Sequence, residues 1–304
     1  MSTDGLKYYL ENPRMIYAYF SSRGLLNWMP DETYLKIAYK AHIGKSLNLD
    51  NPQTFNEKLQ WLKLYDRNPL YTQLVDKYKV RKYISEKIGE QYLIPLVGGP
   101  WNSVDEVDFD KLPEQFVLKC THDSGGLVIC RDKSSLDIEA AKIKLNESLK
   151  RNYYWSGREW PYKNVKPRII AEKYMTDESG TALDDYKFMM FNGEYKCMFV
   201  CSNRFSKDGL NVTFFDPNWN RLPFERKYHS DSNELKKPES YSEMVNISKK
   251  LSDDKTFVRV DCYEINHRPY VGELTFSPGG GMEIFYPSEW DRKLGDWIVL
   301  PKKQ

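Results

Sequence analysis

Apolar residues follow a helical period in the first hundred residues of the chain and a strand period later. Thr54 and Glu57 form a capping-box pattern before the run KLQWLKLY, which predicts the start of a helix. Residues 71–89 carry apolar side chains at helical spacing, so we expect one helix there that ends at Gly89. The N-terminal region is therefore predicted to be mainly helical.

From about residue 115 onward, the pattern changes to short apolar runs that are typical of strands. Residues 115–122 and 126–132 surround a glycine-containing loop, and residues 185–202 are divided by Asn192-Gly193, a strong hairpin signal. The other expected elements are a hairpin at 257–277, strands at 167–175 and 211–216, a helix at 135–151, and a helix that Ser240 and Glu243 would cap.

This order of elements predicts an α+β fold in three parts. We expect a mainly helical region at residues 1–98 and a small α+β subdomain with a glycine loop at residues 99–175. A larger antiparallel α+β subdomain would follow at residues 176–304.

Charge and composition narrow the classes of function. The 304 residues include 45 basic and 43 acidic ones, a net charge of +2 that does not favour a nucleic-acid surface. No apolar run reaches the ~18 residues of a spanning helix, and no signal-peptide pattern opens the sequence. The five cysteines include no C-x-x-C motif, so we expect reduced core residues in a cytoplasmic protein. Residues 15–29 either pack on the body or touch a membrane surface, and the oligomeric state stays open.

Two carboxylates in the last hairpin give the clearest chemical signal. Asp261 and Glu273 stand in strand-like runs on either side of Asn266-His267, so antiparallel pairing can bring both to one face. Two carboxylates so placed repel each other unless they share a cation or a proton. They suit Mg²⁺, which takes one or two carboxylates together with phosphate oxygens.

Three further motifs precede this hairpin. Lys119 stands before THDSGG, and a lysine beside glycine N–H groups suits a polyphosphate. Glu172 and Lys173 end an apolar strand, and Asp185 and Lys187 lie on one side of the next strand. Each motif alone is usually a turn, a solvated strand edge or a structural ion pair, but beside the acid pair they suit a polyphosphate bound with Mg²⁺.

The ordered set resembles the ATP-grasp fold, and most closely the TupA-like (teichuronopeptide biosynthesis) ATP-grasp family, which is found with bacterial surface-polysaccharide genes. The stretches that carry the resemblance, within residues 50–297, are TFNEKLQWLKLYD, FVLKCTHDSGG, PRIIAEKYM, DYKFMMFNGE and VRVDCY…GELTFSPGGG. The EKYM and RVDCY…GELTFSPGG stretches also resemble D-alanine–D-alanine ligases. The resemblance implies two α+β subdomains that clamp ATP, preceded by the helical region.

The resemblance also implies a role for each matching residue. Lys119 would contact the α- and β-phosphates of ATP, and Lys187 and Arg259 would act near the transferring phosphoryl group. One or two Mg²⁺ ions would be bound by Asp261, Glu273 and Thr275. The glycine loop, the adenine hinge and the ribose contact would be formed by Ser124, Gly125, Gly126, Glu172, Lys173, Met175, Asp177 or Glu178, and Asp185. The reacting acyl group would meet N–H groups of Gly279, Gly280 and Gly281.

One departure from the family pattern concerns the metal. Many ATP-grasp ligases have Glu-x-Asn where this chain has Glu273-Leu274-Thr275. Either Thr275 or Ser277 takes the place of the amide, or one metal site is weaker, so the number of ions stays open.

Two segments outside the motifs contain candidate substrate contacts. Residues 151–163 include Arg158 and Trp160, which either bind a sugar or pack on the body. Arg204 either binds a substrate carboxylate or lies in a solvated turn.

The leading hypothesis is an ATP-dependent carboxylate–amine ligase that forms an amide through an acylphosphate. The family resemblance implies a uronic acid or similar carboxylate, an amino acid or amino sugar as the amine, and a role in capsule, O-antigen or exopolysaccharide synthesis. The alternatives are a glycosyltransferase of the same pathway, a kinase of a sugar hydroxyl, and a nucleotide-binding module without catalysis.

Overall fold

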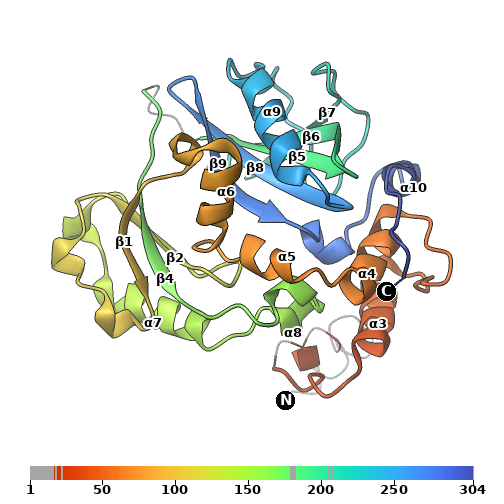
Figure 1. Ribbon diagram of the computed structural model, residues 1–304, viewed down its shortest axis with the longest axis horizontal. Coiled ribbons are helices and arrows are strands. Elements are labelled where there is room, and N and C mark those ends of the chain that lie inside the picture. The colour runs from red at the N-terminus through yellow and green to blue at the C-terminus, as the bar shows by residue number, and fades with distance from the viewer. Residues whose placement is uncertain are drawn as a thin grey trace.

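The computed structural model describes residues 17, 19–21, 23–178, 183–204, 206 and 209–303. It contains a small and a large antiparallel sheet, with helices around both, and this confirms the predicted α+β class (Figure 1). The small sheet lies to the left in that view, and the N-terminal helices lie below and beside the large sheet. Residues 1–16 of the expected helical region are outside the described part of the chain.

The strand order is β1-β4-β2-β3 in the small sheet and β7-β6-β5-β8-β9 in the large sheet. The small sheet consists of β1 (Leu96–Trp101), β2 (Phe116–Cys120), β3 (Leu127–Cys130) and β4 (Ile169–Lys173). The large sheet consists of β5 (Asp185–Phe191), β6 (Glu194–Ser202), β7 (Asn211–Phe215), β8 (Phe257–Ile265) and β9 (Arg268–Thr275). The hairpins predicted around Asn192-Gly193 and Asn266-His267 are confirmed.

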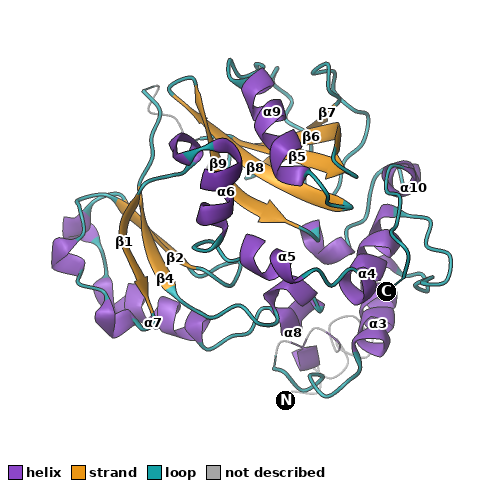
Figure 2. Ribbon diagram, viewed as in Figure 1, coloured by secondary structure: helices purple, strands orange, loops and turns teal. Residues whose placement is uncertain are grey.

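Helices pack around both sheets (Figure 2). The N-terminal ones are α3 (Asp31–Ile43), α4 (Phe55–Tyr65), α5 (Pro69–Leu74) and α6 (Val80–Ile88). The later ones are α7 (Ile138–Leu149), the short α8 (Tyr154–Gly157), α9 (Tyr241–Ser252) and α10 (Glu289–Asp296). None of the described helices is long and apolar enough to cross a membrane.

The side chains of strand β2 alternate between the two faces of the small sheet. Phe116, Leu118 and Cys120 are buried in a core that includes Leu145 of α7. Because side chains alternate along a strand, Lys119 points to the opposite face.

The large sheet carries an apolar core on each face. One core joins the sheet to α5, α6 and α9 and contains Phe188 and Val260. The other joins it to α3, α4 and α10 and contains Met189 and Phe199. Lys187 is two residues before Met189 in β5, so it shares the face that α3, α4 and α10 cover.

Local capping signals were right at one helix and wrong at another. The Glu57 N–H donates to Thr54 Oγ1 (3.2 Å) and the Thr54 N–H donates to Glu57 Oε2 (3.0 Å), which confirms that capping box. The capping box predicted at Ser240 is wrong, because the Ser240 hydroxyl donates to Glu264 Oε2 of β8 (2.5 Å) instead.

The single helix predicted for residues 71–89 is also wrong, since α5 and α6 are separate. Asp76 lies between them and accepts hydrogen bonds from the N–H groups of Tyr78 (2.9 Å) and Lys79 (3.2 Å). It also pairs with Arg168 (2.7 Å). A side chain that binds nearby backbone N–H groups competes with helical hydrogen bonds, and the helix is interrupted there.

Helix α4 holds the glycine-rich 3₁₀ turn Pro278–Gly281 that follows β9. Asn56 Nδ2 donates to the carbonyl of Glu283 (2.8 Å), and Gln60 Nε2 donates to the carbonyls of Gly280 (3.0 Å) and Gly281 (2.6 Å). Asn56 and Gln60 are fully buried, so these bonds fix the backbone of the turn from the protein interior.

We expect Gly281→Ala to destabilise the fold more than Gly280→Ala does. Both glycines have positive φ, 63° and 64°. A Cβ on Gly281 would lie 2.5 Å from Gln60 Nε2 and 2.8 Å from Leu59 Cβ, whereas a Cβ on Gly280 would meet nothing within 4 Å. The difference should be about 1–3 kcal/mol in urea unfolding, the usual cost of overpacking. Equal losses would mean that α4 does not hold the turn.

Candidate active site

Charged side chains form a row across β5, β8 and β9. Lys187 stands opposite Asp261 in the β5–β8 pairing, and Asp261 stands opposite Glu273 in the β8–β9 pairing. Arg259 lies two residues before Asp261 and stands opposite Thr275. Side chains that are directly opposite each other share a face. We call Lys187, Asp261, Arg259 and Glu273 the charged row.

Asp261 is buried, and two cations bind its carboxylate. Arg259 donates from Nε to Oδ1 (2.6 Å) and from Nη2 to Oδ2 (2.7 Å), and Lys187 Nζ also donates to Oδ2. Burial alone would raise the pKa of Asp261, but Arg259 and Lys187 outweigh burial and hold it below the usual range. Burial alone would lower the pKa of Lys187, and Asp261 outweighs burial there and raises it. Both groups are therefore charged at neutral pH.

Glu273 and Thr275 supply the accessible oxygens beside the row. The Glu273 side chain is 44% exposed, whereas that of Asp261 is 2% exposed. Arg259 Nη2 donates to Glu273 Oε1 (3.3 Å) and to Thr275 Oγ1 (3.0 Å). Oxygen donors of this kind suit Mg²⁺. Among the described residues, no three His, Cys, Asp or Glu side chains lie close enough together to hold a metal ion, so an ion here would take further oxygens from water or a bound phosphate.

Asp185 lies beside the row and is itself paired. Arg204 donates to Asp185 Oδ2, and Lys187 Nζ lies 3.9 Å from the same oxygen. Asp185 is buried, and its carboxylate binds Arg204. Of the residues expected to contact the ribose, Glu178 is the exposed one. The sequence-based roles of Arg204 and Asp185 toward ligands stay predictions.

Lys119 forms an ion pair with Glu172 on the small sheet. The Lys119 Nζ to Glu172 Oε2 distance is 2.5 Å, and Arg81 Nη1 of α6 lies 3.6 Å from Glu172 Oε1. The Lys119 side chain is 21% exposed, so its ammonium is partly accessible. The residue expected at the adenine hinge, Glu172, is here the counter-ion of the lysine expected to bind phosphates.

Tyr153 links the glycine loop to the charged row. Ser124 and Gly125 are exposed in the loop between β2 and β3. Tyr153 interacts with Ser124, and burial and then the charges of Glu159 and Glu273 raise the pKa of Tyr153. The loop expected at the phosphates and the carboxylate expected at the metal therefore lie near the same phenol.

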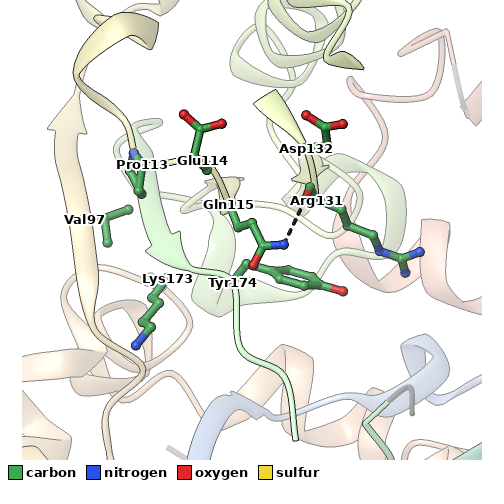
Figure 3. Close-up of a pocket in the computed structure, with 8 residues that line it drawn as sticks. All are labelled: Val97, Pro113, Glu114, Gln115, Arg131, Asp132, Lys173 and Tyr174. Atoms are coloured by element: carbon green, nitrogen blue, oxygen red, sulfur yellow. Dashed lines mark hydrogen bonds between the residues drawn. The ribbon is translucent and has the colours of Figure 1, made fainter. Parts of the chain in front are cut away.

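Two cavities flank the end of β4, where the hinge is expected. One, of about 500 Å³, is lined by Val97, Pro113, Glu114, Gln115, Arg131, Asp132, Lys173 and Tyr174 (Figure 3). The other, of about 440 Å³, lies between Met175 and the turn that joins β8 to β9. Neither cavity includes Lys119 or the charged row, so both border the hinge and lie outside the charged centre.

The glycine run at 279–281 is held more tightly than the sequence indicated. The Gly280 N–H donates to the carbonyl of Ser277 (2.9 Å), so this N–H is not free for an acyl oxygen, which corrects the expectation for Gly280. Gln60 and Lys63 bind carbonyl oxygens of the run. Sequence analysis missed these two residues, although buried Asn56, Gln60 and Lys63 stand at helical spacing in an otherwise apolar segment and could have revealed them.

Arg158 is not available to a substrate. Its side chain is fully buried, and its guanidinium lies 4.2 Å from the ring centre of Tyr34 and 4.5 Å from that of Trp155. It donates to the carbonyl of Leu26 (2.9 Å) and so fastens the N-terminal segment, which corrects the expectation that Arg158 contacts substrate. Trp160 is partly buried, and its role toward substrate stays a prediction.

We expect Asp261→Asn to lower the free energy of unfolding by about 3–5 kcal/mol, because it leaves two buried cations without their shared carboxylate. Glu273→Gln should cost less than about 1 kcal/mol, because the Glu273 side chain is 44% exposed and its ion pair is solvated. Urea unfolding of the two variants and the wild type measures both losses. Similar losses would contradict the central place of Asp261 in the row.

The sequence matches the family model for TupA-like ATPgrasp over residues 57–299. No curated protein matches the chain. The family match agrees with the resemblance that the motifs indicated, so the predicted family and the predicted ATP-grasp fold are confirmed.

Several solved structures have a related arrangement. A D-alanine–D-alanine ligase from Bacillus anthracis, complexed with ATP, is 16% identical at a TM-score of 0.41; the match covers 74% of this chain and 63% of that one. An L-amino acid ligase from Bacillus licheniformis is 14% identical at a TM-score of 0.49, over 91% of this chain and 64% of that one. Because the family model matches most of the chain, the protein belongs to the TupA-like ATP-grasp family.

Proposed function

We propose that this chain is an ATP-dependent carboxylate–amine ligase that forms an amide through an acylphosphate. The observation that carries the proposal is the charged row, which is built from paired strands of the large sheet. Tyr153, which interacts with Ser124 of the glycine loop, also feels the charge of Glu273. Fixed charges of this kind stabilise phosphoryl transfer by positioning and by neutralising developing charge.

The donor atoms fit Mg²⁺. The Glu273 carboxylate and the Thr275 hydroxyl would hold an ion, together with Asp261 if Arg259 or Lys187 released one of its oxygens. When bound, Mg²⁺ neutralises phosphate oxygens during transfer. Whether one or two ions bind depends on how well Thr275 replaces the amide that many ATP-grasp ligases have.

The residues of the chain would act on ATP and on the acid in turn. Lys119 would exchange Glu172 for the phosphates of ATP, and Ser124 with Gly125 would fold over them. A carboxylate oxygen of the substrate would attack the γ-phosphorus and displace ADP, while Arg259 neutralises the oxygens of the transferring group. The amine would then attack the acyl carbon, displace inorganic phosphate and lose a proton.

The family resemblance supports a proposal for the classes of the two substrates. We propose a uronic acid or similar carboxylate of a bacterial surface polysaccharide as the acid, and an amino acid or amino sugar as the amine. Phosphorylation of a sugar hydroxyl is the alternative that the same charged row would serve, and it requires no acyl intermediate.

We expect hydroxylamine to trap the activated acid. With Mg·ATP, hydroxylamine and a panel of uronic acids and amino acids, the correct acid should give ADP and a hydroxamate detectable by mass spectrometry. A stable phosphomonoester without hydroxamate, for every acid that stimulates ADP release, would replace the ligase with a kinase. UDP release from a sugar nucleotide would support the glycosyltransferase.

We expect Lys119→Met to weaken binding of a nonhydrolysable ATP analogue by about tenfold or more, since a charge-assisted hydrogen bond is worth about 1.5–3 kcal/mol. Calorimetry measures the dissociation constant. The matched control is Lys142→Met, which removes an exposed lysine of α7 and should leave affinity unchanged. Equal affinities for the two variants would place Lys119 outside the nucleotide site.

A further inference from the structure

Glu159 is a buried carboxylate that accepts no hydrogen bond among the described residues. It lies between α8 and the 3₁₀ turn Trp160–Tyr162 and is 6% exposed. Among the described residues, no hydrogen bond or close ion pair involves its carboxylate. Both of its carboxylate oxygens keep some contact with solvent. A buried carboxylate without hydrogen bonds is costly, and a ligand with N–H donors would supply them.

The nearest cation, Lys63, gives Glu159 charge but no hydrogen bond: burial raises the pKa of Glu159 to about 7, and the charge of Lys63 only partly opposes burial. A Cβ on Gly157 would lie 3.4 Å from Glu159 Oε1 and 3.9 Å from Lys63 Nζ, which shows that the two groups are neighbours. Lys63 Nζ already donates to Gln60 Oε1 (3.1 Å), to the carbonyl of Gly157 (2.9 Å) and to that of Gly280 (2.6 Å). A lysine has three N–H donors, and all three are used.

The other neighbours of Glu159 belong to the proposed ligase site. The charges of Arg259 and Glu273 both act on its carboxyl group. Tyr153 and Tyr162 feel the charge of Glu159 and lie edge to face, with ring centres 4.8 Å apart. Lys63 places Glu159 beside the glycine run, because it also binds Gly280.

We propose that Glu159 binds the amine substrate as its ammonium ion, with Tyr153 and Tyr162 forming the walls of the amine site. This inference rests on the proposed ligase function. A carboxylate beside the glycine run would hold the nitrogen close to the acyl carbon, and once the ammonium has released one proton to water its nitrogen has a free lone pair for the attack. An ammonium is the ligand that a buried carboxylate favours, because its three N–H donors form charge-assisted hydrogen bonds. Because the two rings touch each other, an ammonium would lie against the face of one of them and gain cation–π attraction there.

The experiment compares a cationic amine with a neutral nucleophile. Hydroxylamine is uncharged at neutral pH and needs no counter-ion, whereas glycine, L-glutamate and glucosamine carry an ammonium group. Wild type and Glu159→Gln are assayed with Mg·ATP and the acid that gives the hydroxamate. For the best cationic amine, kcat/KM should fall at least about 30-fold in the variant through a raised KM. Hydroxamate formation and the KM for ATP should change less than about threefold.

The controls separate the amine site from folding and from the ligase activity itself. Glu147→Gln changes an exposed glutamate of α7 and should behave as wild type. If Glu159→Gln does not fold, Glu159→Asp keeps the charge, shortens its reach, and should show the same selective rise in KM.

Equal losses with hydroxylamine and with the cationic amine would overturn the inference, since they would make Glu159 structural. So would a wild-type enzyme that makes hydroxamate but uses no cationic amine. Absence of hydroxamate in the wild type would instead remove the proposed function.

Discussion

Lys187 and Arg259 share one buried carboxylate, that of Asp261, and the geometry of the candidate site depends on this pairing. The three side chains come from β5 and β8, so their distances are set by strand register. A slip of one residue in a strand would turn its side chains to the opposite face. In β5 and β8 such a slip would move charges into the apolar core against α9. The cores on both faces of the large sheet therefore protect the register and, through it, the charge arrangement.

Helix α4 supports the same site from the helical layer that covers this face of the large sheet. Helix α4 binds the glycine run through Gln60 and Lys63, and Lys63 also binds the carbonyl of Gly157. Arg158 fastens the adjoining loop to the carbonyl of Leu26. The segment with Glu159 is thus supported by groups that lie far away in sequence. Preorganised support of this kind keeps reacting groups in place.

Sequence analysis predicted much of the fold because its signals are local. The apolar runs on either side of the Asn192-Gly193 turn predicted β5 and β6. The positions of Asp261 and Glu273 on either side of one turn predicted that they share a face. The failures were tertiary. Ser240 binds Glu264 and leaves its capping role, and Arg158 is covered by rings from other segments. No sequence pattern states which distant residues will cover a side chain.

The position of α4 bears on where the smallest folding unit of this protein begins. The family match starts at residue 57, inside the helix Phe55–Tyr65. Thr54, which caps the helix, and Asn56, which binds the backbone of Glu283, precede that start. A fragment cut at the family boundary would keep Gln60 and Lys63 on a helix that has lost its cap and one of its anchors. The segment that family members share in sequence is therefore shorter than the unit that can hold the glycine run in place.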